Sequence, residues 1–280
     1  MDIGEIIAPA TGVVVFALKF AVGFNLRWAS FAYFGDQYAL WFRSVLSAVL
    51  LPPLLAWGLI QVLELPEGTT IALIVLALSP GAPLSPIKAF RAGGNFNYSI
   101  SLLLWLNALC LITIPLFLGW FNGRYQAGLQ AHAGPLAMQV VGAVVLPMGL
   151  GFLAGQLLPA WRARYGPGLV RVSFFLLAVL GVLLLIGFRQ SLWQTDLRTY
   201  AAYAVFLVLL LLAGHGLGGP RPENRSALAH LSATRNLGLV LFLAALNYEL
   251  TEVLATLVPY LVVLLLVSGS YNAIRKQARM

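Results

Sequence analysis

The stretch ALSPGAPLSPIKAF, residues 77–90, interrupts a run of sequence that is apolar enough to lie inside a membrane. Pro80, Pro83 and Pro86 each lack a backbone N–H, and a proline ring clashes with the preceding helical turn, so the segment is expected to unwind. A break that faced lipid would leave carbonyl groups without partners, so it must be buried in protein or line a water-filled cavity. A proline kink that binds nothing is the alternative interpretation.

Composition indicates the class of protein. Of the 280 residues, 60% are hydrophobic and 9% are charged, and the mean hydropathy is +0.89. Soluble domains lie far from these values, so we expect a polytopic membrane protein, with the lipid bilayer as its surroundings and no soluble domain. Cys110 is the single cysteine, which excludes an internal disulfide and a cysteine-rich metal site. We therefore expect no metal and no cofactor.

The chain contains nine apolar runs of about 20 residues, the length that an α-helix needs to cross a bilayer. The runs are continuously apolar and lack the alternation of barrel strands, so the predicted fold is all-α. They cover residues 6–26, 44–63, 69–87, 99–120, 135–159, 172–188, 199–217, 226–248 and 253–272.

Basic residues are distributed unequally between the loops of this nine-helix arrangement. One face collects Arg27, Arg43, Arg91, Arg162, Arg164, Arg171, Arg221, Arg225, Arg275, Lys276 and Arg279, whereas the other holds Arg124, Arg189 and Arg198. Cytoplasmic loops carry the excess of Lys and Arg, so we expect a cytoplasmic C-terminus and an external N-terminus in the cell membrane. The net charge of +8 reflects this topology, and no nucleic-acid site is inferred from it.

Three basic residues lie within the predicted spans. Lys19 and Lys88 are near cytoplasmic ends and are expected to extend their ammonium groups towards the headgroups, although Lys88 is also a candidate for lining an inward vestibule. Arg235 follows Ser226 by nine residues, which puts it about 14 Å into its span. A basic group at that depth costs about 2.5–3.5 kcal/mol, so Arg235 is expected either at a binding site or bound to backbone carbonyl groups.

A second polar interruption surrounds Arg235, in LSATRNLGLV, residues 231–240. It contains no proline, so the sequence alone does not establish that it unwinds. If residues 126–168 are a connector, residues 1–125 and 169–280 form two four-helix halves of opposite orientation, with the interrupted helix third in each. Paired interrupted helices at matching positions are typical of secondary transporters with inverted repeats, whose substrate site lies between the repeats.

The two interruptions resemble those of the bile acid:sodium symporter family. LALSPGAPLSPIKAF followed by AGGNFNYSISLL is similar to the first crossover of that family, roughly Pro-Gly-Gly-x-x-Ser-Asn and then a helix containing serine. SATRNLGLVLFLA is similar to its second crossover, roughly Glu-x-Gly-x-Gln-Asn-x-Gly. The resemblance implies a core domain that carries both crossing discontinuous helices and moves against a panel domain.

Most sodium ligands that the resemblance implies are absent. Ser85, Ser99 and Asn236 match ligand positions of the family, but other ligand positions hold residues without a suitable oxygen, namely Pro86, Leu103, Leu231 and Arg235. We therefore hypothesise that Arg235 is a built-in cation that replaces sodium.

A fixed guanidinium at the crossover predicts an organic anion as substrate, because its planar fork of donors matches a carboxylate or a sulfonate. The residues expected around this anion are Ser79, Ser85, Lys88, Ser99, Thr234, Arg235 and Asn236, with Pro80, Gly81, Pro83 and Pro86 shaping the crossover backbone and Tyr98 and Trp105 as candidate apolar walls.

The predicted function is secondary transport of a small organic anion by alternating access, without the usual sodium coupling. The sequence leaves three modes of coupling open: coupling to protons through Lys88, exchange of one substrate for another, and facilitated diffusion. A non-transporting receptor or scaffold of the same fold is one alternative, and a metalloid exporter is another, although Cys110 lies outside both crossovers. An enzyme is not expected, because no carboxylate accompanies a histidine inside a span. The Gly151–Gly155 pair suits close helix contact but does not define an oligomeric state.

Overall fold

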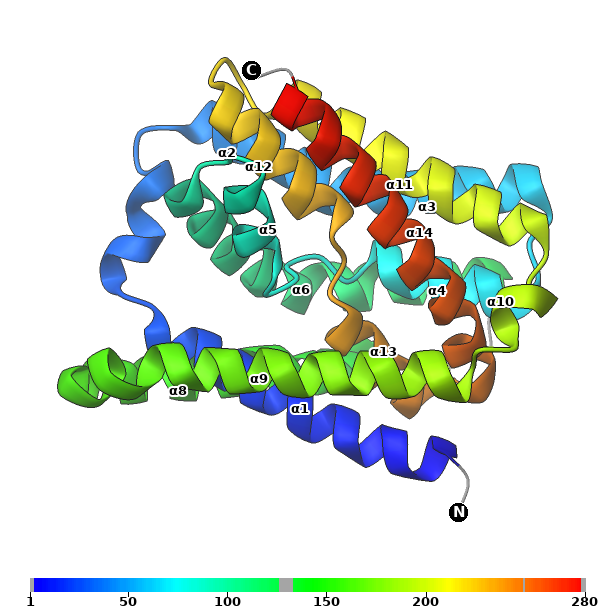
Figure 1. Ribbon diagram of the computed structural model, residues 1–280, viewed down its shortest axis with the longest axis horizontal. Helices are drawn as coiled ribbons and strands as arrows, with labels where there is room; N and C mark the ends of the chain where they lie inside the picture. Colours follow the sequence, from blue (N-terminus) through cyan, green and yellow to red (C-terminus); the bar gives the residue numbers. More distant parts are fainter. Residues whose placement is uncertain (1–2, 126–132, 249, 278–280) are drawn as a thin grey trace.

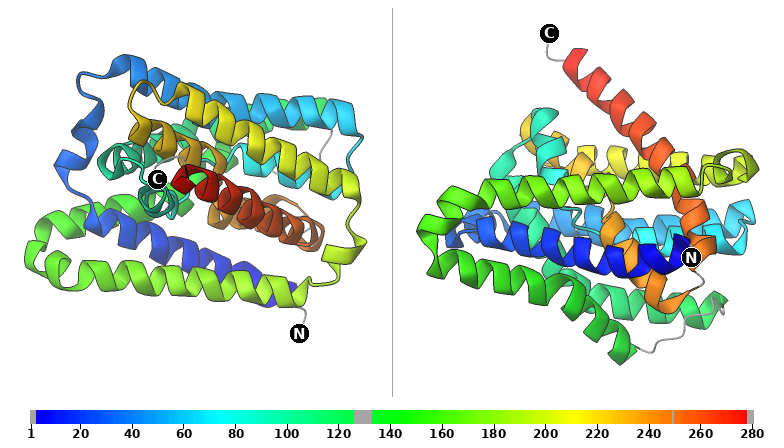
Figure 2. Two further views of the ribbon diagram at one scale, coloured as in Figure 1. Left: turned by 45° about the horizontal axis from the view of Figure 1, so that its top comes forward. Right: turned by 60° about the horizontal axis from the view of Figure 1, so that its bottom comes forward.

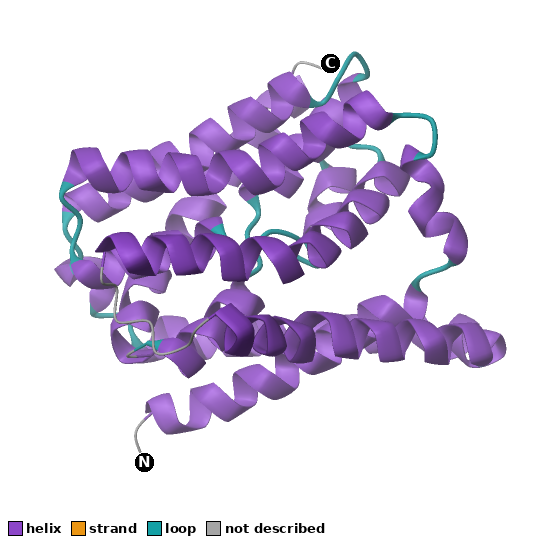
Figure 3. Cartoon of the chain, turned by 180° about the vertical axis from the view of Figure 1, so that it is seen from behind, coloured by secondary structure: helices purple, strands orange, loops and turns teal. Residues whose placement is uncertain are grey.

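The computed structural model describes residues 3–125, 133–248 and 250–277, and within these ranges the chain forms helices and no strand (Figures 1 and 3). The first half comprises α1 (Ile3–Asn25), η1 (Trp28–Phe34), α2 (Tyr38–Val45), η2 (Leu46–Leu50), α3 (Leu51–Leu63), α4 (Glu67–Ala77), α5 (Ser85–Arg91) and α6 (Phe96–Tyr125). The second comprises α7 (Ala133–Val140), η3 (Val141–Val145), α8 (Leu146–Leu157), α9 (Pro159–Gly187), α10 (Ser191–Gln194), α11 (Leu197–Leu217), α12 (Pro222–Ala233), α13 (Leu237–Asn247) and α14 (Leu250–Gln277).

One group of helices, which we call the lower layer, consists of α1, α8 and α9. The three lie side by side along the lower side of Figure 1, and α1 packs along both α8 and α9 (Figures 1 and 2). A Cβ atom on Gly151 would collide with the Phe20 carbonyl oxygen, and one on Gly155 with that of Phe24. The Gly-x-x-x-Gly spacing therefore serves close packing of α8 on α1 within this chain.

The remaining long helices form the upper layer. There α11 packs against α3, α12 and α14, and α5 and α6 pack against each other and against α12. The helix pairs α4–α5 and α12–α13 are each interrupted, and α13 also contacts α1 of the lower layer. The interruptions thus lie within the packed interior of the molecule, as the burial requirement for a broken membrane helix demands.

Seven described helices are long and apolar enough to cross a membrane: Tyr38–Leu63, Phe96–Phe121, Ala137–Leu157, Pro159–Gly187, Leu197–Leu217, Pro222–Asn247 and Glu252–Gln277. The pair Pro9–Asn25 and Trp28–Phe34, bent by 84°, brings the number to eight if it counts as one span. The expected span at residues 69–87 contains the shorter helix α4 and the start of α5. The total of nine spans stays a prediction.

Two local expectations differ from the structure. The unwound segment ends before Pro86, because Pro86 lies in the first turn of α5, where helical N–H groups have no partner and a proline is therefore tolerated. A loop was also expected between residues 159 and 172, yet α9 begins at Pro159 and continues through this basic stretch. Pro159 is therefore in the first turn of α9, whereas the sequence predicts that a membrane span ends at this residue.

Candidate functional site

The two interrupted helices meet at their breaks. Residues 78–84 separate α4 from α5, and residues 234–236 separate α12 from α13 (Figure 1). The backbone N–H of Asn236 donates to the carbonyl oxygen of Ser79 at 2.8 Å, which joins one break directly to the other. The region around Arg235 is therefore unwound although it contains no proline, and both interruptions belong to one site, which we call the crossing.

Arg235 occupies the centre of the crossing and is 1% exposed. Its Nε donates to the carbonyl oxygen of Leu76 at 2.9 Å, and one terminal nitrogen donates to that of Ala77 at 2.6 Å. The other terminal nitrogen donates to the carbonyl oxygens of Ala48 at 3.2 Å and Ser232 at 3.0 Å. The guanidinium thus connects the last turns of α4 and α12 to η2.

Proline explains why these carbonyl groups are available. In a continuous helix the Leu76 carbonyl accepts from the residue four positions later, which here is Pro80 and has no N–H. The Ala48 carbonyl is followed at four and five positions by Pro52 and Pro53, so neither an α-helical nor a π-helical donor exists for it. Arg235 therefore supplies a donor to the Ala48 carbonyl, which has no α-helical or π-helical donor, and a second donor to the Leu76 carbonyl, which keeps only the bond from the Ser79 N–H at 3.1 Å.

Three residues predicted to bind substrate lie in the two breaks of the crossing and have a side-chain polar atom without a partner. Ser79 Oγ, Thr234 Oγ1 and Asn236 Nδ2 are buried and have no hydrogen-bond partner among the described residues. Asn236 Oδ1 is used locally, because it accepts from the backbone N–H of Leu239 at 3.3 Å and caps α13. Buried polar atoms are normally paired, so these three unpaired atoms are unusual and are available to a ligand.

Other predicted residues are used for local bonds. Ser85 Oγ donates to the carbonyl oxygen of Ala82 at 2.6 Å, and Ser99 Oγ to that of Asn95 at 2.7 Å. Tyr98 is buried against Ser44, with 2.7 Å between the hydroxyl oxygens, so it is no open apolar wall.

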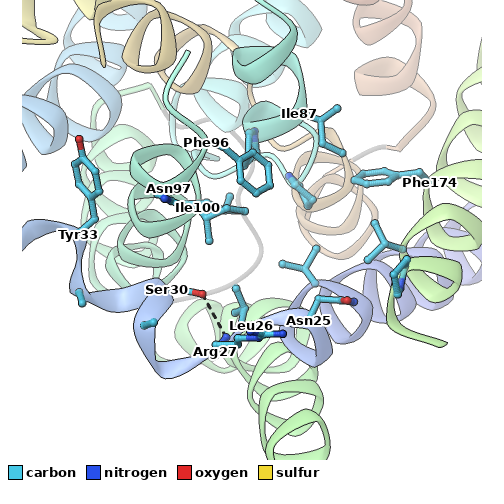
Figure 4. A pocket seen from close by; sticks show the side chains of 18 of the residues that line it. Asn25, Leu26, Arg27, Ser30, Tyr33, Ile87, Phe96, Asn97, Ile100 and Phe174 are labelled. Carbon is cyan, nitrogen blue, oxygen red and sulfur yellow. Dashed lines mark hydrogen bonds between the residues drawn. The ribbon is translucent and has the colours of Figure 1, made fainter. Parts of the chain in front are cut away.

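An open cavity of about 860 Å³ lies between the two layers (Figure 4). Its residues come from α1, η1, α6 and α9 and from the stretch around the start of α5. They are Val22, Asn25, Leu26, Arg27, Ala29, Ser30, Ala32, Tyr33, Pro83, Pro86, Ile87, Phe96, Asn97, Ile100, Leu103, Pro167, Val170, Arg171 and Phe174. The walls are mostly apolar with a few polar groups, which is the usual character of a site for an organic ligand.

The sequence predicts only some of the residues that line this cavity. Pro83 and Pro86 line it, whereas Lys88, half-buried on α5, is not among the lining residues. Asn97 and Arg171 were missed as cavity residues, because each reads as an ordinary polar residue near a helix end. Asn97 lies in AGGNFNYSISLL, the segment that resembles the family's first crossover. This resemblance is the sequence feature that indicates Asn97 as a candidate.

Lys19 contradicts its predicted role as a residue that reaches the headgroups. It is 1% exposed, and its Nζ donates to Asn107 Oδ1 at 2.5 Å. The Asn107 amide in turn donates to the carbonyl oxygen of Leu103, which lines the cavity. Gly81 lies against the same amide, and its φ of 76° is accessible mainly to glycine. Lys19 and Asn107 therefore lie between the cavity and the crossing.

In the described ranges, no group of three His, Cys, Asp or Glu side chains is placed so that it could hold a metal ion. Residues 12–195 match a family model described as the Sodium Bile acid symporter family. The match includes the first interruption and ends before the second. No curated protein matches the chain.

Proposed function

The chain belongs to the sodium bile acid symporter family of membrane transporters, and from that premise we propose that it moves a small organic anion by alternating access without sodium. As a family member with several apolar helices it is a multi-pass membrane protein. Transport rather than catalysis is the activity of this family.

The carbonyl cluster bound by Arg235 carries the proposal. Carbonyl oxygens of unwound segments and the C-terminal ends of half-helices are the groups with which secondary transporters hold Na⁺. Here the oxygens of Leu76, Ala77 and Ser232 accept from a guanidinium that stays charged at every physiological pH. A cation is therefore built into the position, and its charge would repel a mobile sodium ion.

An anion is the ligand that this charge favours. The positive N-terminal end of the half-helix α13 points at the crossing, beside the unpaired atoms of Ser79, Thr234 and Asn236. The sequence predicts that the fork of Arg235 contacts a carboxylate or a sulfonate, but in the structure its donors are directed at backbone carbonyl oxygens. Arg235 is thus proposed to act on the anion through its field, with the neutral polar atoms making the contacts.

Movement is proposed between the two layers. The cavity separates the lower layer from α5 and α6 and is flanked by Arg27 and Arg171, two residues of the strongly basic face. By the distribution of basic loops this face is cytoplasmic, so the conformation is proposed to be inward-facing, with the N-terminus outside. The inverted halves 1–125 and 169–280 and the connector 126–168 belong to the same proposal.

Counterflow in proteoliposomes tests transport itself. We expect saturable exchange of at least one labelled anion from a panel of carboxylates and sulfonates, including taurocholate as a bile acid. Exchange needs no gradient, so it does not depend on the coupling ion. Saturable binding with no exchange for any anion of the panel would favour the receptor or scaffold alternative. Exchange of neutral or cationic solutes alone would contradict the proposed anion.

Arg171→Ala is expected to raise the half-saturating anion concentration about two- to fivefold at low salt, which corresponds to the roughly 0.5–1 kcal/mol of an exposed charge pair. The effect should shrink at high salt because the charge is screened. Arg164 lies on the same helix, is exposed and is not a cavity residue. Equal effects of Arg164→Ala and Arg171→Ala in the same counterflow assay would contradict a role of the cavity in anion binding.

A further inference from the structure

The hydrogen bond between Lys19 and Asn107 joins the two layers. Lys19 belongs to α1 of the lower layer, and Asn107 belongs to α6 of the upper layer, on the opposite side of the cavity. Asn107 also contacts Gly81 in the first break and bonds to Leu103 in the cavity wall. Any movement that separates the layers at this level must break or stretch the Lys19–Asn107 bond.

Within the part of the chain that the structure describes, no carboxylate forms a salt bridge with this ammonium. Both salt bridges found in the described residues are made by Arg198, with Glu64 and Asp196, at exposed positions. The elements η3, α8 and α13, which pack on α1, contain no titratable residue. α9 contributes Arg162, Arg164, Tyr165 and Arg171, and α6 contributes the buried thiol of Cys110, one turn after Asn107. Lys19 therefore depends on Asn107 for its main polar contact.

Lysine and arginine differ in what they offer at such a place. A guanidinium does not lose its proton in proteins, whereas a lysine ammonium is able to exchange it. The crossing thus has a permanent charge on Arg235, and the layer boundary has an exchangeable one on Lys19. A charge-assisted hydrogen bond is roughly twice as strong as a neutral one, so proton release weakens the connection between the layers.

We infer that Lys19 is the proton-coupling site of this protein: the protonated side chain ties α1 to Asn107, and release of the proton lets the layers separate. The coupling of protons to transport rests on the proposed function. The proton-dependent connection between the two layers does not. The proton passes between Lys19 and water, and no other group is consumed.

The histidines do not offer the same connection. His215 Nδ1 pairs with the hydroxyl of Tyr271 at 2.9 Å, and His230 Nε2 pairs with Asn272 at 2.9 Å. Both partners lie on α14, so these bonds stay within the upper layer. Lys88 lies on α5 of the upper layer as well. Among these groups, Lys19 alone is seen to bond across the boundary.

Distance measurements between the layers test the inference without any ligand. Spin labels at the exposed positions of Arg91 on α5 and Arg164 on α9, in a Cys110→Ser background, report the separation in lipid nanodiscs between about pH 5 and about pH 10. We expect two distance populations whose ratio changes at least about tenfold over this range. Lys19→Arg should stay in the low-pH population and Lys19→Met in the high-pH population.

His230→Gln serves as the control and should keep the pH-dependent shift. A shift in Lys19→Arg equal to that of the unsubstituted protein would overturn the inference, and this variant decides the matter even if Lys19→Met fails to fold. Absence of any shift in the unsubstituted protein would overturn it equally.

Uptake separates this inference from the proposed function. A pH gradient should accumulate labelled taurocholate, or whichever panel anion shows counterflow, and Lys19→Arg should lose at least about tenfold of this accumulation. Counterflow together with gradient-driven accumulation that Lys19→Arg leaves intact would refute proton coupling and leave transport standing. A pH-dependent distance shift without counterflow of any anion would refute the proposed function and support Lys19 as a proton-sensitive connection.

Discussion

Replacing Arg235 with methionine is expected to lower the melting temperature of the protein in detergent by roughly 10 °C, because several buried acceptors lose their donor at about 1 kcal/mol or more each. The carbonyl oxygens of Leu76, Ala77, Ala48 and Ser232 would all be affected. Anion counterflow should disappear at the same time, since the charge and the geometry of the crossing are lost together. Thermal unfolding followed by intrinsic fluorescence measures the first effect.

Two variants frame this result. Arg235→Lys keeps the charge, but an ammonium presents its donors at one point and does not reach carbonyl groups on three segments, so we expect an intermediate melting temperature. Arg198→Ala removes an arginine whose salt bridges are at the surface, and such bridges contribute little. A melting temperature of Arg235→Met equal to that of Arg198→Ala would contradict the role given to the guanidinium.

Gly81→Ala is expected to cost about 2–3 kcal/mol of stability and to abolish counterflow. About 1–2 kcal/mol of this comes from the left-handed backbone, since φ is 76°. The rest comes from Asn107, because a Cβ on Gly81 would lie 3.1 Å from its Nδ2 atom. The amide has little freedom to move away, since it is bonded to both Lys19 and the Leu103 carbonyl.

Gly219→Ala is the matched control. Gly219 has a φ of 78°, and its nearest neighbour is Leu40 Cδ1 at 3.5 Å from the Cβ position, an ordinary contact. Both substitutions therefore share the backbone strain, and only Gly81→Ala adds the collision at the crossing. Equal losses of melting temperature for the two variants, with counterflow retained in Gly81→Ala, would show that the packing of Asn107 on the break is unimportant.

The sequence predicts the first break well because its cause is local. Pro80 and Pro83 remove helical donors wherever the chain packs, and the length and hydropathy of the neighbouring runs predict helices in a membrane. The family resemblance read from the same residues is confirmed by the family model. The unwinding of residues 234–236 has a different origin, because it depends on the bond from Asn236 to Ser79 and on the carbonyl groups gathered by Arg235.

Lys19 shows where reasoning along the chain fails. Its depth in α1 predicted contact with headgroups, but the partner that holds it, Asn107, is 88 residues away in sequence. Depth within one helix gives no information on which face of that helix is covered by another. For the same reason the sequence does not identify Asn97 and Arg171 as cavity residues. They line one cavity in the folded protein, but no pattern in the sequence relates them.

The sodium dependence of uptake tests the central claim most directly. Proteoliposomes containing the unsubstituted protein would be given either an inward sodium gradient or an equal choline gradient, and uptake of the anion identified by counterflow would be compared. With Arg235 occupying the carbonyl cluster, we predict equal uptake under the two gradients. Uptake that rises about tenfold or more with sodium alone would contradict the account, because it would require a sodium site that the guanidinium leaves open.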